Sequence, residues 1–220
     1  MTGMNEGMLF SCVLFTAAGF LSGSVMYSLL LPKAFKNIDV RAASSDGNPG
    51  GINAMRAAGT GMGLFCIALD VLKAYIPVRL SLAYLGADGL WLVPAVAAPV
   101  LGHAFSPFLR FKGGISTLFG AMLALWPVSK AIAILVFFTV LFKFAAVVRP
   151  DSAGFVVSVC ASGAAVFFLE PLAWVRTAFF LSGAVVLYRL IRNPNAGEMS
   201  LTLGRCVFCL ADRRLKIIRR

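Results

Sequence analysis

The sequence is poor in charged residues, and poorest in acidic ones. Among its 220 residues, 13% are charged and 60% are hydrophobic, and 9 Asp and Glu stand against 20 Lys and Arg. Soluble domains are typically about 45–50% apolar and about 25% charged. Together with a mean hydropathy of +0.88, this composition excludes a soluble globular domain and a disordered chain. It indicates a polytopic helical membrane protein.

Histidine and paired cysteines are scarce too. The chain has 1 histidine and 5 cysteines, and Cys12, Cys66 and Cys160 lie inside apolar runs. Cysteine in such a run usually acts as a small hydrophobic residue. Cys206 and Cys209 form one C-x-x-C motif without the second pair that a zinc site needs. We therefore expect no disulfide framework, no metal site and no cofactor.

Long apolar runs fill most of the chain. A membrane span needs about 20 mainly apolar residues. The first run is too long for a cleaved signal peptide, and no basic segment precedes it. The sequence predicts an all-α membrane protein, a bundle of about seven transmembrane helices at about residues 8–31, 61–77, 81–102, 114–129, 131–148, 154–170 and 173–191.

The basic residues are divided unevenly between the loops. If the N-terminus lies outside, 15 of the 20 Lys and Arg fall on the inside and 3 on the outside, with Lys73 and Lys143 within spans. Because cytoplasmic loops collect Lys and Arg, the N-terminus is predicted outside and the C-terminus in the cytoplasm. The same rule explains the net charge of +11 without a nucleic-acid partner. We expect residues 1–203 to form one integral membrane domain, and residues 204–220 a basic cytoplasmic tail on the anionic inner leaflet.

Two ionisable residues, Asp70 and Lys73, lie together inside the second predicted span. Their spacing of three residues places them on one face of a helix. Ionisable groups at this depth are costly and are commonly functional. The pair either neutralises itself and steadies the bundle, or leaves Lys73 to bind an anionic substrate near the inner surface. The spacing alone favours neither alternative.

The loop after the first predicted span, residues 39–56, is rich in Gly, Ser and Asn. Its glycines permit tight turns, in which successive N–H groups can form a concave anion site. A helix beginning near Asn53 would also favour an anion at its N-terminus. The alternative is an ordinary turn between two spans. The residues that would serve a phosphate here are Arg41, Ser44, Ser45, Gly47, Asn48, Gly50, Gly51, Asn53 and Arg56.

A second inside loop, residues 101–114, carries His103, Ser106 and the run Lys112-Gly113-Gly114. A lysine beside two glycines is similar to a phosphate-binding turn, although the spacing G-x-x-x-x-G-K-[ST] is missing. A lone histidine at a helix end is more often structural than catalytic. The predicted topology places both polar loops at the cytoplasmic face. That arrangement suits a phosphorylated, lipid-linked substrate better than a transported ion.

Three blocks between about residues 20 and 120 match one family pattern in order and spacing. The first block is Gly23-Ser24 with Ile38-Asp39-Val40-Arg41 and Gly47-Asn48-Pro49-Gly50-Gly51-Ile52-Asn53-Ala54-Met55-Arg56. The second is Leu69-Asp70-Val71-Leu72-Lys73-Ala74, and the third is Leu101-Gly102-His103-Ala104-Phe105-Ser106 with Phe111-Lys112-Gly113-Gly114. In these blocks the chain resembles the bacterial acyl-phosphate:glycerol-3-phosphate acyltransferases, which are integral membrane enzymes.

The chain departs from that family pattern at four places. The family's S-G-N becomes Asp46-Gly47-Asn48 with one extra residue after Arg41, so Ser44 or Ser45 would stand in for the missing Ser. Ile52 stands where the family has Thr, which removes a hydroxyl from the first loop. Ile115-Ser116-Thr117 follows Gly114 where the family has Lys. The family's late H-R-E-N motif can be laid only loosely on Tyr188-Arg189-Leu190, without its His and Glu.

The resemblance implies transfer of a fatty acyl group from acyl phosphate to the 1-hydroxyl of glycerol 3-phosphate. The products would be lysophosphatidate and phosphate, formed at the cytoplasmic face of the bacterial inner (plasma) membrane for phospholipid biosynthesis. The alternative is a catalytically degenerate member that binds phosphorylated lipid precursors or a partner protein. The implied phosphate-binding residues are Ser44, Ser45, Gly47, Gly50, Gly51, Arg56, Lys73, Ser106, Lys112, Gly113 and Gly114.

The implied catalytic residues are His103, Asn48 and Asn53. The two asparagines and nearby amides would stabilise charge on the carbonyl oxygen. The base is either His103 or the departing phosphate. We favour the phosphate, because the sequence shows no nucleophile–base pair.

Overall fold

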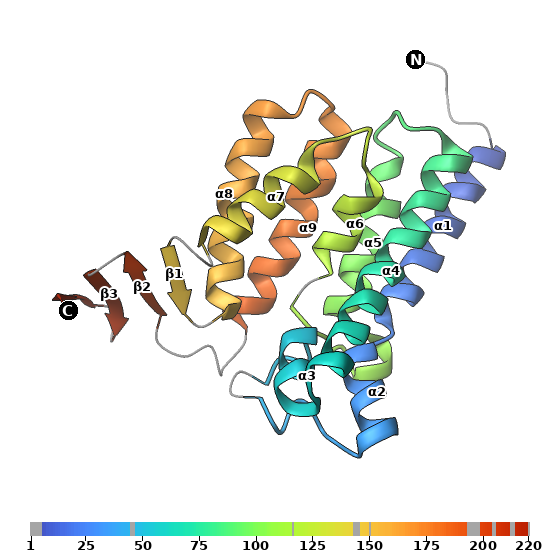
Figure 1. The fold of residues 1–220 in the computed structure, drawn as a ribbon. Helices are drawn as coiled ribbons and strands as arrows, with labels where there is room; N and C mark the ends of the chain where they lie inside the picture. Colours follow the sequence, from blue (N-terminus) through green and yellow to red (C-terminus); the bar gives the residue numbers. More distant parts are fainter. Residues whose placement is uncertain are drawn as a thin grey trace.

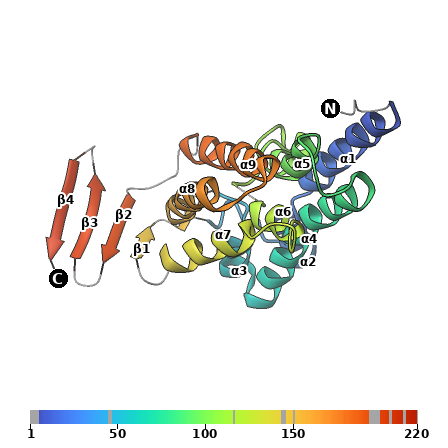
Figure 2. The ribbon, with the colours of Figure 1, turned by 90° about the horizontal axis from the view of Figure 1, so that it is seen from above.

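The computed structural model describes residues 6–44, 47–115, 117–142, 146–149, 151–192, 199–203, 206–211 and 214–219. Within these ranges, helices form the body of the molecule, and a small sheet extends from one side of it (Figure 1; Figure 2). The helices are α1 (Glu6–Ser24), α2 (Tyr27–Lys36), α3 (Gly51–Ala58), α4 (Thr60–Leu85), α5 (Leu92–Ala104), η1 (Pro107–Leu109), α6 (Leu118–Ala124), α7 (Ala131–Val140), α8 (Asp151–Leu169) and α9 (Ala173–Ile191).

Several of these helices have the length and composition of membrane spans. Among the described residues, four are long and apolar enough to cross a membrane, namely Glu6–Ser24, Thr60–Leu85, Leu92–Leu109 and Ala173–Leu190. Two shorter apolar helices are Ala131–Val140 and Gly154–Leu169. In chain order, the seven predicted spans correspond to α1 with the start of α2, and then to α4, α5, α6, α7, α8 and α9. However, α6 has 7 residues and α7 has 10, which is less than a straight crossing needs.

The first predicted span is divided, because α1 ends at Ser24 and α2 begins at Tyr27. Carbonyl groups at such a break lose their partners within the helix and need others. Ser106 Oγ donates to the carbonyl of Ser24 at 2.7 Å, and Lys73 Nζ donates to that of Val25 at 2.5 Å. Side chains from two other segments therefore hold the break between α1 and α2.

Helices α1 and α5 approach closely because glycines lie where they touch. A Cβ atom on Gly23 would collide with the backbone of Pro99, and one on Gly102 would collide with the carbonyl of Phe20. Small residues commonly allow such close approach between helices in membranes. The contact brings the polar loop that follows α5 against the end of α1.

The apolar core has two parts. The larger lies among α4, α5, α6, α7, α8 and α9, and it fully buries large side chains such as Leu118, Met122 and Phe179. The smaller consists of Val40, Ala54 and Cys66, which pack the first polar loop and α3 against α4. This second cluster fixes the place of a loop that would otherwise only link two helices.

The sheet was not expected from the sequence. Its strands β1 (Ala146–Arg149), β2 (Met199–Leu203), β3 (Cys206–Ala211) and β4 (Arg214–Arg219) lie in chain order and pair antiparallel. The predicted span 131–148 therefore does not continue as one helix, and its last residues belong to β1. Hydropathy identified that span, and it does not separate helix from strand in a short apolar run. The sequence of β2 alternates between apolar and polar residues, a period typical of strands.

Candidate functional site

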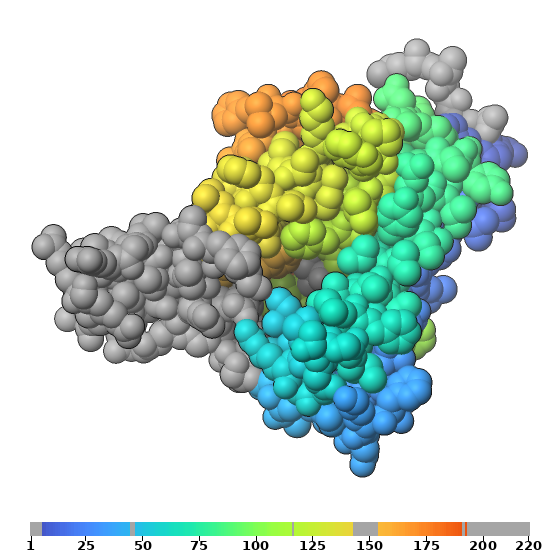
Figure 3. Space-filling view, in the orientation of Figure 1, coloured from blue at the N-terminus to red at the C-terminus, as the bar shows by residue number. Residues whose placement is uncertain are grey.

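The two polar loops of the sequence meet at one end of the helical bundle. Helices α2 and α3 lie at that end in the space-filling view (Figure 3). Asn48 Oδ1 accepts a hydrogen bond from the backbone N–H of Ile115 at 3.2 Å, across 67 positions of sequence. Asn53 Nδ2 donates to the backbone carbonyl of Asn48 at 2.8 Å. The predicted catalytic asparagines therefore lie together, beside the glycine-rich turn of the second loop.

The predicted helix in the first loop is confirmed, and it begins at Gly51 as α3. A Cβ atom on Gly51 would collide with Ile67, so the first turn of α3 lies directly against α4. Gly47 adopts a left-handed φ of 62°, a conformation that glycine reaches without strain. The first-turn amides of a helix have no carbonyl acceptor within it and favour anions. The turn and the helix together can therefore receive a phosphate.

The backbone of the second loop folds tightly under the end of α5. The N–H of Gly113 donates to the carbonyl of Ala104 at 3.1 Å, and that of Gly114 donates to the carbonyl of His103 at 2.9 Å. A Cβ atom on Gly113 would collide with the carbonyl of His103. Both glycine amides are thus used within the protein. A phosphate at this loop would be held by the side chains around it.

Two arginines hold the carbonyls of this loop from opposite parts of the chain. The Arg41 guanidinium donates to the carbonyl of Lys112. Arg189, on α9, donates to the carbonyl of Gly113 at 2.7 Å and to that of Gly114 at 3.3 Å. The sequence analysis counted Arg41 among the loop charges but did not select Arg189. One feature of the sequence could have identified Arg189: it aligns with the Arg of the family's late H-R-E-N motif.

Arg41 is itself fixed by a local turn. Asp39 Oδ1 accepts the N–H of Arg41 at 3.0 Å. Burial lowers the pKa of the Arg41 guanidinium, and the charge of Asp39 acts in the opposite direction. Because the ordinary pKa of arginine lies far above neutral pH, the group stays positive there. Arg41 therefore adds a permanent charge next to Lys112.

Lys73 is buried and fully engaged, with 4% of the residue exposed. Its Nζ lies 2.7 Å from Asp70 Oδ1 and donates to the carbonyl of Val25. The other carboxylate oxygen, Asp70 Oδ2, accepts from Ser28 Oγ at 2.5 Å. These contacts correspond to the self-neutralising alternative for the Asp70–Lys73 pair.

His103 lies beneath the second loop, with 3% of the residue exposed. A Cβ atom on Gly114 would collide with His103 Nε2, so the glycine covers the ring. His103 Nδ1 has no hydrogen-bond partner within the part of the chain that the structure describes. The imidazole is therefore separated from solvent by the loop that would bind the phosphate.

The remaining predicted residues divide between the surface and the interior. Lys112 and Arg56 are exposed, and Ser44 Oγ donates to the carbonyl of Arg41 at 3.1 Å. Ser106 is buried and bonded to the end of α1, so it is not brought to the surface with the others. Ser45 lies outside the described residues. Within those residues, no group of three or more His, Cys, Asp or Glu is placed to hold a metal ion.

Helices of membrane-spanning length define an integral membrane protein, here one with a cationic, glycine-rich end. A family model described as glycerol-3-phosphate acyltransferase matches residues 13–196. The protein belongs to this family, as its motifs predicted.

Relatives and solved structures agree with this membership. A glycerol-3-phosphate acyltransferase of Anaeromyxobacter dehalogenans is 33% identical over 196 residues, covering 84% of this chain and 94% of the relative. Glycerol-3-phosphate acyltransferase 2 of Thermotoga maritima is 40% identical over 117 residues, covering 52% of this chain and only 59% of that relative.

The crystal structure of PlsY (YgiH), an integral membrane glycerol 3-phosphate acyltransferase, matches in its glycerol 3-phosphate form with a TM-score of 0.73. That match has 27% identity and covers 84% of this chain and 90% of the other. The form with lysophosphatidic acid gives a TM-score of 0.71 at 25% identity, with the same coverage of both chains. The integral membrane fold predicted from composition is confirmed.

Proposed function

We propose that the protein transfers a fatty acyl group from acyl phosphate to the 1-hydroxyl of glycerol 3-phosphate. The products are lysophosphatidate and inorganic phosphate. The observation that carries this proposal is the junction of the two family loops through Asn48 Oδ1 and the N–H of Ile115. The solved relatives with glycerol 3-phosphate and with lysophosphatidic acid support the acceptor and the product.

The two phosphates of the substrates bind to cations and helix amides at the joined loops. Lys112 and Arg56 are the exposed cations, and Arg41 and Arg189 add charge while they shape the second loop. The first turn of α3 adds backbone N–H groups. Gly113 and Gly114 act by permitting close packing over His103, since their amides already have acceptors.

The chemical step needs no covalent enzyme intermediate. The 1-hydroxyl oxygen of glycerol 3-phosphate attacks the acyl carbonyl carbon, and the bond from that carbon to the phosphate oxygen breaks. The departing phosphate accepts the hydroxyl proton, because His103 is enclosed beneath Gly114. Asn48, Asn53 and nearby amides stabilise the carbonyl oxygen, where one donor is worth about 10²–10³-fold in rate.

The membrane setting follows from the charge distribution. We infer about seven spans with the N-terminus outside, and an active site facing the cytoplasm of a bacterial inner membrane. The basic loops at the α3 end of the bundle support this orientation. We also infer a boundary between a membrane domain of residues 1–203 and a tail of residues 204–220. The family match ends at residue 196, short of that boundary, and the sheet crosses the boundary through the pairing of β2 with β3.

The test is product formation by the purified protein in lipid nanodiscs. Hexadecanoyl phosphate and glycerol 3-phosphate should yield lysophosphatidate and phosphate in equal amounts, with no lysophosphatidate when the acceptor is omitted. Phosphate release without lysophosphatidate would contradict the transfer. If the folded protein binds both substrates and releases neither product, the degenerate alternative replaces this proposal. The features that favour that alternative are Ile52 in place of the family's Thr, the missing family Lys and the missing late His.

A further inference from the structure

The register of the small sheet divides its residues between two unlike faces. Residues that lie opposite one another in paired strands share a face, and successive residues of a strand alternate between faces. Val148, Leu201, Phe208 and Ile217 form one row across all four strands. Every strand residue on the same face as this row is apolar, except Arg219 at the end of β4. We call this face the apolar face.

The opposite face, which we call the polar face, has the remaining polar residues of the strands. They are Arg149, Ser200, Thr202, Arg214 and Lys216. Antiparallel sheets commonly pack one face on apolar material and expose the other to water. The division of residues between the faces therefore predicts that the apolar face is covered.

The helical bundle does not provide that cover. Among the described elements, β1 packs against α8, whereas β2, β3 and β4 make their main contacts with one another. Figure 1 and Figure 2 show these three strands extending sideways from the bundle, away from the helices. The cover for the apolar face must therefore come from outside the bundle.

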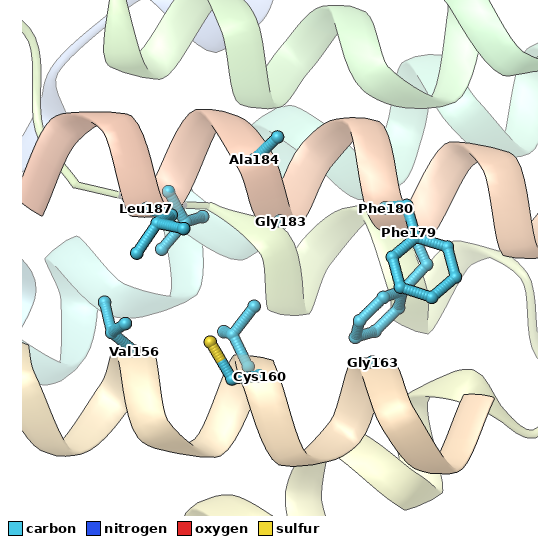
Figure 4. A pocket seen from close by; sticks show the side chains of 10 residues that line it. Val156, Cys160, Gly163, Phe179, Phe180, Gly183, Ala184 and Leu187 are labelled. Carbon is cyan, nitrogen blue, oxygen red and sulfur yellow. The ribbon is translucent and has the colours of Figure 1, made fainter. Parts of the chain in front are cut away.

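The two helices nearest the sheet present apolar surface to the membrane. An apolar groove lies between α8 and α9, and Figure 4 shows side chains from both helices along it. Cys160, Phe180 and Leu187 of its lining are exposed. Phe168, farther along α8, is 81% exposed. This side of the bundle therefore faces lipid.

The end of α9 marks where this lipid-facing surface stops. The Arg192 guanidinium lies 5.8 Å from the centroid of the Tyr188 ring, and both residues are exposed. Tyrosines are enriched at the membrane–water interface, and arginines near helix ends extend to the headgroups. Because α8 and α9 form a hairpin, the start of α8 lies at this same end (Figure 1). Strand β1 ends at Arg149, just before α8 begins at Asp151, so the sheet joins the bundle at the membrane surface.

The open edge of the sheet restricts how deep it can lie. Strand β4 is at the edge of the described sheet, where half of its backbone N–H and C=O groups have no strand partner. Such groups need water, and open sheet edges do not occur within the hydrocarbon of a bilayer. The interface between headgroups and hydrocarbon supplies both water for the edge and apolar material for the apolar face.

We propose that the sheet is a membrane-surface element, whose apolar face rests on the inner leaflet at a surface rich in anionic phospholipid. The charge of this segment is complementary to such a surface. Residues 199–220 contain Arg205, Arg213, Arg214, Lys216, Arg219 and Arg220, against Asp212 as the one acidic residue. Apolar burial and attraction to anionic lipid together hold amphipathic elements at an interface. This inference uses the proposed cytoplasmic position of the C-terminus and does not depend on acyl transfer.

Two native cysteines allow a first test, because Cys206 lies on the apolar face and Cys209 on the polar face of the same strand. Each is kept as the one cysteine of a full-length variant, with the others replaced by Ala, and is labelled with bimane. The nanodiscs contain phosphatidylglycerol and phosphatidylcholine. Doxyl-labelled lipid should quench the Cys206 label at least about twofold more than the Cys209 label, since the apolar face of an interfacial element lies about 5–10 Å deeper. Iodide in the water should show the reverse order.

The other outcomes of this test overturn the proposal. Equal quenching of the two labels by iodide would mean that both faces lie in water. Protection of the Cys206 label from both quenchers would mean that protein, such as a second copy of this chain, covers the apolar face. Neither result depends on whether the protein makes lysophosphatidate, so the acyl transfer is judged separately.

The second test places a carboxylate on one face or the other. Leu201→Asp adds it to the apolar face, and Thr202→Asp, the matched control, adds it to the polar face of the same strand. Leu201→Asp should abolish the doxyl quenching of the Cys206 label, because burial of an unpaired carboxylate is prohibitive. Thr202→Asp should keep most of it. Equal quenching in the two variants would overturn the proposal.

The third test changes the charge of the lipid. In nanodiscs of phosphatidylcholine alone, doxyl quenching of the Cys206 label should fall, because each Lys or Arg beside an anionic surface strengthens binding about fivefold. High salt should lower the quenching in the phosphatidylglycerol nanodiscs in the same way. Quenching that is unchanged by both conditions would overturn the assignment to an anionic surface.

Discussion

Two carboxylates in different parts of the helical bundle, the half-buried Asp70 and the buried Glu170, have different partners and different roles. Asp70 lies on α4 beside the break between α1 and α2, and it is paired with Lys73 and Ser28. Glu170 lies at the connection between α8 and α9, at the far end from α3 (Figure 1). Its Oε2 accepts from Ser129 Oγ at 2.5 Å, and its Oε1 accepts from the N–H of Leu172 at 3.2 Å.

The two carboxylates are stabilised in different ways. Glu170 precedes the first turn of α9, where the helix dipole favours a negative charge, and Ser129 also caps the start of α7 through the N–H of Ala131. Asp70 instead neutralises a lysine that reaches into the helix break below the polar loops. The contacts of Glu170 join helices, whereas those of Asp70 also position the site. Their substitutions should therefore differ in what they affect.

The largest effect is expected from Lys73→Met. The change leaves the half-buried Asp70 without its cation and the carbonyl of Val25 without its donor, which costs about 3–5 kcal/mol of unfolding free energy. Thermal unfolding in detergent should show a large fall in Tm, and acyl transfer should be lost. The double variant Asp70→Asn/Lys73→Met removes the unpaired charge and should recover most of the Tm. If Lys73→Met is as stable and as active as wild type, the Asp70–Lys73 pair neither stabilises the bundle nor positions the site.

Gly113→Ala should abolish activity with a smaller loss of stability. The added methyl group collides with the carbonyl of His103 and shifts the loop that carries Lys112. We expect kcat/KM to fall by at least about 10²-fold, because misplacing a substrate-binding group by about 1 Å has that effect. The matched control is Gly61→Ala on α4, where a Cβ atom meets nothing within 4 Å. If both variants behave alike in the transfer assay, the packing over His103 has no functional role.

Substitutions of Glu170 should lower the stability of the protein and leave its turnover unchanged. Glu170→Ala removes the acceptor for Ser129 and for the N–H of Leu172, at a cost of about 1–3 kcal/mol. Glu170→Gln keeps a hydrogen-bonding group there and should cost less. For both variants, kcat/KM per folded protein should equal that of wild type. A specific loss of turnover in Glu170→Gln at unchanged Tm would show that this end of the bundle also takes part in the reaction.

The smallest effect is expected from Ile52→Thr, which restores the hydroxyl that the family pattern has at this position. Ile52 is 40% exposed in the first turn of α3, so the change should leave Tm nearly unaltered. One added hydrogen bond to a bound phosphate is worth about 0.5–1.5 kcal/mol, or about 2–10-fold in kcat/KM. Isothermal titration with glycerol 3-phosphate and steady-state kinetics measure the gain. A decrease in both would mean that Ile52 itself packs against the substrate.

The sequence predicted the parts of the molecule that depend on local composition. Apolar runs located α1, α4, α5, α6, α7, α8 and α9, and the glycine-rich segment before Asn53 located the start of α3. The family motifs identified both polar loops. These features are local, because an apolar run or a glycine turn forms its structure without contacts from distant segments of the chain.

Contacts between distant segments could not be read from the sequence. Nothing in residues 8–31 signals that the helix breaks at Val25, because the break is stabilised by Lys73 and Ser106 from elsewhere. Arg189 meets Gly113 across 76 positions, and only the family motif pointed toward it. The strands escaped prediction because apolar runs as short as β1 fit either structure.

The most direct test of the account compares two exposed lysines at the same end of the molecule. Lys112 lies in the proposed phosphate site, and Lys33 lies on α2 outside it. Lys112→Ala should reduce lysophosphatidate formation from hexadecanoyl phosphate and glycerol 3-phosphate by about 10²-fold, with Tm unchanged. Lys33→Ala should leave both unchanged. Equal activities of the two variants would contradict the claim that the joined loops bind the phosphates of the reaction.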